Sequence, residues 1–99
     1  MSAAKLSAEE IAQHLGKLPG WSNQNDALTK TYTFKNFTGA MQFVNLVAET
    51  AEVVQHHPDI EIRYTKVTLT LSTHDAGGVT QKDVDSAASA DDYADTVAQ

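Results

Sequence analysis

Apolar residues recur with a helical period in three segments of the chain. In the first segment, residues 8–18, Ser7 stands at the N-cap position and Glu10 follows three residues later, as in a capping box. Apolar side chains at helical spacing continue through the segment, and Pro19 is expected to end the helix. The pattern therefore predicts an amphipathic helix close to the start of the chain.

The longest predicted helix covers residues 37–56. Asn36 is suited to cap it, and apolar residues recur at intervals of three and four along its length. Pro58 is expected to end this helix and to favour an extended conformation at His57. The apolar stripe predicts core packing rather than a cofactor site.

The third helix is predicted after a glycine pair, in the last twenty residues. Thr80 stands at its N-cap position, and Asp83 follows three residues later in the capping-box position. Aspartates dominate the charges of this segment. We expect them to form a solvated helix face.

Apolar and polar residues alternate between the helices, as in half-buried β-strands. Segments 21–22 and 27–34 flank a turn-forming Asn/Asp cluster, and segments 59–64 and 67–71 form a second pair. Short connections favour antiparallel pairing, and amphipathic helices favour coverage of one sheet face. The sequence thus predicts one α+β domain over residues 1–99, of order α-β-β-α-β-β-α, with a four-stranded antiparallel sheet and three helices on one face.

Composition narrows the functional classes. A hydrophobic content of 41% and a charged content of 20% are ordinary for a folded domain. The net charge is −6, and the seven basic residues are scattered, so direct binding of nucleic acid is disfavoured. Without cysteine there is no disulfide, zinc–thiolate site or thiol nucleophile.

No part of the sequence predicts a membrane association. No apolar run approaches the roughly 20 residues that a spanning helix needs. The first five residues lead directly into a polar helix signal, with no apolar stretch of the secretory type. We expect a cytoplasmic protein.

Three of the four histidines lie between residues 56 and 74. Glu52 and His56 are four residues apart, so on one helix they share a face, and the helix C-terminus favours an imidazolium at His56. His57 is expected to point elsewhere. His74 follows the fourth predicted strand, which brings it near the His-His-Pro corner if that strand runs beside the third. An imidazole held in this way is suited to donate a proton near neutral pH.

The same histidines are compatible with simpler roles. A histidine at a helix end often serves only as a cap. A metal site is disfavoured because neighbouring helical histidines diverge by about 100° and neither His-x-x-x-His nor His-Glu-x-x-His occurs. Nucleophilic catalysis is disfavoured because Gly-x-Ser-x-Gly and cysteine are absent. General acid–base chemistry remains as the prediction.

Fixed gaps separate the residues of the second half of the chain whose side chains could take part in acid–base chemistry. The pattern is Glu52-x3-His56-His57-Pro58-x5-Tyr64-x9-His74-x8-Asp83, and it includes Leu71-Ser72-Thr73-His74. This pattern resembles the pterin-4a-carbinolamine dehydratase family. The resemblance extends to Leu18-Pro19-Gly20-Trp21 and to the helix near Phe37, so it covers nearly the whole chain.

The resemblance implies dehydration of 4a-hydroxytetrahydrobiopterin or a related pterin to quinonoid dihydropterin. This hydro-lyase reaction follows an aromatic amino-acid hydroxylase and supports recycling of tetrahydropterin. It needs a proton delivered to the leaving hydroxyl and a proton taken from a pterin ring nitrogen. The resemblance implies no metal and no cofactor, the reduced pterin being the substrate, and it implies a homodimer or homotetramer.

Residue roles follow from the same resemblance. Its implied catalytic residues are His56, His57 and His74, with either His56 or His74 favoured as acid. Glu52 is expected to orient His56, and Asp83 to support the site. The implied substrate-binding set is His57, Asp59, Ile60, Ser72 and Thr73.

One position departs from the family pattern, and the family also includes a second kind of function. Ile60 stands where many relatives carry an aromatic residue, so a surface for stacking a pterin is missing there. Some family members act as dimerisation cofactors for a homeodomain transcription factor. The alternative function is therefore a non-catalytic protein-binding module of the coactivator type that retains the fold.

Overall fold

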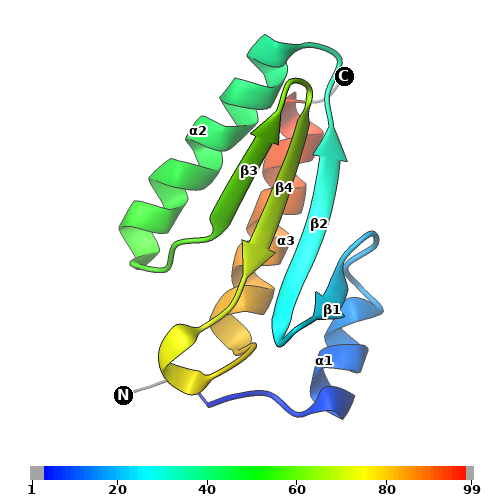
Figure 1. The fold of residues 1–99 in the computed structure, drawn as a ribbon, viewed down its shortest axis with the longest axis vertical. Coiled ribbons are helices and arrows are strands. Elements are labelled where there is room, and N and C mark those ends of the chain that lie inside the picture. Colours follow the sequence, from blue (N-terminus) through cyan, green and yellow to red (C-terminus); the bar gives the residue numbers. More distant parts are fainter. Residues whose placement is uncertain (1–3, 98–99) are drawn as a thin grey trace.

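The structure, a computed structural model, describes residues 4–97 and has the predicted order of elements (Figure 1). Its elements are α1 (Ala8–Leu15), β1 (Ser22–Gln24), β2 (Ala27–Thr33), α2 (Phe37–Val54), β3 (Asp59–Arg63), β4 (Lys66–Leu71), the short 3₁₀-helix η1 (His74–Ala76) and α3 (Gln81–Val97). The predicted α-β-β-α-β-β-α order is confirmed. Within the described residues, no helix combines the length and the apolar character needed to cross a membrane.

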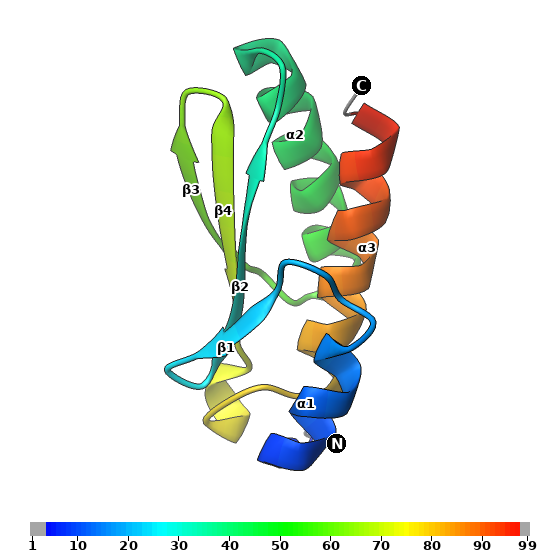
Figure 2. The same cartoon turned by 90° about the vertical axis from the view of Figure 1, so that its right-hand side faces the viewer.

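The four strands form one antiparallel sheet in the order β1-β2-β4-β3. Along β4, Val67, Leu69 and Leu71 are buried, whereas Thr68 and Thr70 point to the opposite, open face. Figure 2 shows the three helices on one side of the sheet. The predicted α+β arrangement with helices on one face is confirmed, and the other face of the sheet is left open.

The first two helices end earlier than predicted. α1 ends at Leu15 because Gly16, a poor helix former, takes the C-cap position. α2 ends at Val54 because Gln55 adopts the left-handed conformation, with φ 57° and ψ 42°. His56 therefore lies outside the helix, and the expectation that it belongs to the last helical turn is wrong.

A carboxylate on α3, that of Asp91, connects the segment after α1 to strand β2. Asp91 Oδ1 accepts hydrogen bonds from Trp21 Nε1 at 3.1 Å, Lys30 Nζ at 2.9 Å and the Tyr32 hydroxyl at 2.5 Å. Lys30 Nζ also donates to the Pro19 carbonyl at 2.9 Å. Asp91 thus connects α3 to Trp21 and to β2, which lie 59 to 70 positions earlier in the chain.

This arrangement predicts a loss of stability in alkaline solution. Burial and the hydrogen bond to Asp91 raise the pKa of Tyr32 well above its ordinary 10.0. Above pH 10 the unfolded chain loses a proton that the folded chain keeps, so stability present below pH 10 falls by up to about 1.4 kcal/mol per pH unit. Tyr32→Phe is expected to remove this part of the decline in urea unfolding between pH 9 and 11.

The matched control is Tyr64→Phe, because Tyr64 is 73% exposed. It is expected to keep the alkaline decline of the unmodified chain. An equally steep decline in Tyr32→Phe would contradict the assignment to Tyr32.

Candidate active site

A hollow of about 320 Å³ lies where β3 and β4 meet the segment that follows β4. Its lining residues are His57, Asp59, Thr70, Ser72 and His74. Asp59 and Thr70 are register partners at one end of the β3–β4 pair. Because their neighbours along the strands face the core, this hollow belongs to the open face of the sheet.

His74 is positioned by a tight turn. The Thr73 N–H donates to the Gly78 carbonyl at 2.8 Å, and the Gly77 N–H donates to the carbonyls of Thr73 and His74, each at 3.0 Å. Gly77 has φ 75°, which glycine adopts without steric strain. The His74 side chain is exposed, and within the described residues it makes no hydrogen bond. Both ring nitrogens are therefore available to a ligand.

His57, rather than His56, has Glu52 as its carboxylate partner. Glu52 Oε2 lies 2.5 Å from His57 Nε2, and the side chains of His57 and Glu52 are 56% and 75% exposed. The predicted Glu52–His56 contact is wrong, because the left-handed Gln55 turns the chain before His56 can share a helix face with Glu52. Since a carboxylate only accepts, His57 donates from Nε2, and its Nδ1 remains available to a ligand.

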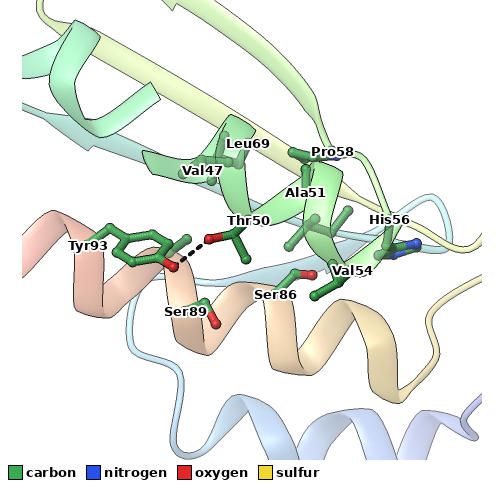
Figure 3. Close-up of a pocket in the computed structure, with 12 residues that line it drawn as sticks. Val47, Thr50, Ala51, Val54, His56, Pro58, Leu69, Ser86, Ser89 and Tyr93 are labelled. Carbon is green, nitrogen blue, oxygen red and sulfur yellow. Dashed lines mark hydrogen bonds between the residues drawn. The ribbon is translucent and has the colours of Figure 1, made fainter. Parts of the chain in front are cut away.

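His56 points toward the helices and pairs with a buried carboxylate. Its Nε2 lies 2.5 Å from Asp83 Oδ1, and the side chains of His56 and Asp83 are 11% and 0% exposed. Figure 3 shows His56 beside Val54 and Ser86, at a pocket between α2 and α3. The structure therefore brings His57 and His74 to one hollow and places His56 outside its lining.

Asp83 connects three segments around His56. Its Oδ2 accepts from the Thr73 hydroxyl and from the Thr80 N–H, both at 2.9 Å. Thr80 Oγ1 accepts in turn from the Lys82 N–H at 3.2 Å, so the predicted cap of α3 by Thr80 and Asp83 is confirmed. A buried carboxylate needs such donors to offset its lost hydration.

Two residues of the expected substrate-binding set do not line the hollow. Ile60 packs against the core on the helix-covered face, since it alternates with Asp59 along β3. Thr73 is 8% exposed, and its hydroxyl is bonded inward. Sequence reasoning missed Thr70, although its polar position in the alternation of β4 already assigned it to the open face.

The residues of the hollow are arranged for hydrogen bonding more than for metal ligation. Among residues 4–97, no group of three or more His, Cys, Asp or Glu side chains has the arrangement to hold a metal ion. His57 already has Glu52 as its partner, whereas the His74 ring has no hydrogen-bond partner in the part of the chain that the structure describes. The chemistry that this geometry offers is proton transfer and polar recognition.

Comparison with known proteins identifies the family. The family model described as pterin 4 alpha carbinolamine dehydratase matches residues 4–93. A protein of Thermomicrobium roseum, provisionally named as that dehydratase, is 57% identical over 81 residues, which are 82% of this chain and 87% of its own.

Solved structures agree. One is described as a transcriptional coactivator/pterin dehydratase from Brucella melitensis; it matches with a TM-score of 0.89 and 34% identity, over 91% of this chain and 98% of its own. A pterin dehydratase-like protein described as a RuBisCO assembly factor of the alpha-carboxysome matches with a TM-score of 0.63 and 23% identity, over 75% of this chain and 86% of its own, and shows the fold alone. With its residue pattern, its fold and its relatives in agreement, the chain belongs to the pterin-4a-carbinolamine dehydratase family.

Proposed function

We propose that this chain dehydrates a 4a-hydroxytetrahydropterin to the quinonoid dihydropterin. The observation that carries the proposal is the hollow on the open sheet face, which His57 and His74 both line. Membership of the dehydratase family supports the same reaction. The natural substrate is proposed to be 4a-hydroxytetrahydrobiopterin or a close relative, supplied by an aromatic amino-acid hydroxylase.

The reaction needs two proton transfers. The C4a–O bond breaks as its hydroxyl accepts a proton and leaves as water, while the neighbouring ring nitrogen loses a proton. His74 is the first candidate for the acid, because its ring is exposed and free of other hydrogen bonds within the described residues. His57, held by Glu52, is proposed to bind the pterin or accept its proton. Each transfer by a positioned imidazole contributes about 10²–10⁴-fold in rate.

His56 is the second candidate for the acid. Its Nε2 is committed to Asp83, so only Nδ1 is left for a proton transfer. A buried carboxylate that fixes the tautomer of an imidazole is a recurring device in general acid–base catalysis. Asp59 and Ser72, from the lining of the hollow, are proposed to bind the pterin ring.

A stopped-flow assay with chemically generated 4a-hydroxytetrahydropterin tests the proposal. We expect the protein to accelerate loss of water well beyond the spontaneous rate, and to do so equally after exhaustive treatment with a chelator, because the proposed groups need no metal. A rate equal to the spontaneous one would exclude the dehydratase function. A rate lost on chelation and restored by a metal would exclude metal-free catalysis.

The alternative is a non-catalytic binding module. The description of the Brucella structure joins coactivator and dehydratase, and α2 exposes Val53 and Val54 at 82% and 52%. We propose homo-oligomerisation on the ground of family membership. Sedimentation equilibrium tests the oligomer, and the absence of any acceleration in the stopped-flow assay would favour the binding module.

A further inference from the structure

A pair of buried hydroxyls lies behind the hollow. Thr73 Oγ1 and Thr80 Oγ1 are 2.7 Å apart, and the two residues are 8% and 0% exposed. Because the Asp83 carboxylate only accepts, the Thr73 hydroxyl donates to it, and Thr80 must then donate to Thr73. The hydrogen bonds form one directed chain, from Thr80 to Thr73 to Asp83. His56 Nε2 contacts the other carboxylate oxygen of Asp83, Oδ1.

Thr73 also fixes the turn that carries His74. Its N–H donates to the Gly78 carbonyl at 2.8 Å, and its carbonyl accepts from the Ala76 and Gly77 N–H groups, each at 3.0 Å. The backbone of Thr73 therefore holds His74, while its side chain holds Asp83 and, through Asp83, His56. A single residue links the two histidines, of which His74 lines the hollow and His56 does not.

We propose that Thr73 and Thr80 are positioning residues that keep His56 and His74 in fixed relation, without touching the substrate. This inference rests on the proposed dehydratase function. Without the Thr73 hydroxyl, Asp83 Oδ2 keeps only the Thr80 N–H as its donor, so the orientation of the carboxylate that holds His56 is less well fixed. A displacement of about 1 Å in a catalytic group can lower a rate by about 10²-fold.

The test compares Thr73→Val with Thr73→Ser. Valine removes the hydroxyl at nearly constant shape, whereas serine keeps the hydroxyl and removes the methyl group. We expect Thr73→Val to lower kcat by about 10–10²-fold with little change in KM, since substrate-contacting groups are retained. Thr73→Ser is expected to retain most of the kcat of the unmodified protein.

The matched control is Thr68→Val. Thr68 Oγ1 pairs with Thr31 Oγ1 at the same distance of 2.7 Å, on the open face and outside the hollow. Removing this hydroxyl is expected to leave kcat unchanged. Thr80→Val provides a second test, with the same direction of effect, if Thr73→Val fails to fold.

Histidine ring ¹⁵N spectra distinguish a role of Thr73 in positioning His56 from a role in packing alone. In the unmodified protein His56 is expected to be protonated at Nε2 toward Asp83, and Thr73→Val is expected to alter this signature while Thr68→Val leaves it unchanged. Unchanged His56 signals, or an equal loss of kcat in Thr73→Ser, would overturn the proposal. If the unmodified protein has no dehydratase activity, the proposed function fails, and the spectra still decide whether Thr73 positions His56.

Discussion

Replacement of His74 by alanine is expected to lower kcat for dehydration by about 10²–10⁴-fold, the usual contribution of one positioned acid or base. His74 lines the hollow, and its exposed side chain makes no hydrogen bond within the described residues. Its removal takes away the proposed proton donor and leaves no buried group unpaired. The fold should therefore survive, which circular dichroism and the urea midpoint would verify.

His14→Ala is the matched control for this variant. His14 lies in the last turn of α1 and does not line the hollow, so its removal should leave kcat unchanged. Stopped-flow rates for both variants, measured at saturating 4a-hydroxytetrahydropterin, check the assignment. Full activity of His74→Ala would exclude His74 as the acid and leave His56 as the candidate for that role.

Local sequence signals predicted the elements well because their causes are local. Ser7 and Glu10 form the expected capping box, and the Asn36 side chain accepts from the Gly39 N–H at 2.8 Å. The alternation in β4 correctly separated core residues from open-face residues. Each of these features depends on residues close to one another in the chain, so the sequence alone contained the information.

The pairing of the histidines could not be predicted in the same way. It depends on Gln55, which takes the left-handed conformation that residues other than glycine rarely adopt. Because of this one residue, the predicted Glu52–His56 pair does not form. Glu52 pairs with His57 instead, and His56 pairs with Asp83. The second pair joins residues 27 positions apart, and only the packing of α3 brings them together.

The two histidine pairs differ in what holds them. The Glu52–His57 pair is largely exposed, and exposed ion pairs contribute only about 0–1 kcal/mol. The His56–Asp83 pair is buried and shares its carboxylate with Thr73 and Thr80. We infer that His57 can adjust to a ligand, whereas His56 is held by the packed core.

The largest effect on stability is expected at Asp91. Asp91→Ala removes the shared acceptor of Trp21, Lys30 and Tyr32, and it leaves the Lys30 ammonium, on a side chain only 18% exposed, without its carboxylate. Breaking a largely buried pair in this way costs about 2–4 kcal/mol. For a domain of this size, that is expected to lower Tm by roughly 10–25 °C.

The activity of the folded Asp91→Ala variant should nevertheless match that of the unmodified protein, because Asp91 does not line the hollow. Asp91→Asn keeps a neutral acceptor for Trp21 and Tyr32, so its loss of stability should be smaller. Asp92→Ala, at an exposed neighbouring position on α3, should have little effect. Urea unfolding and kcat at a temperature where each variant is folded measure both properties. If Asp91→Ala and Asp92→Ala unfolded at the same urea concentration, the cluster around Asp91 would contribute no net stability.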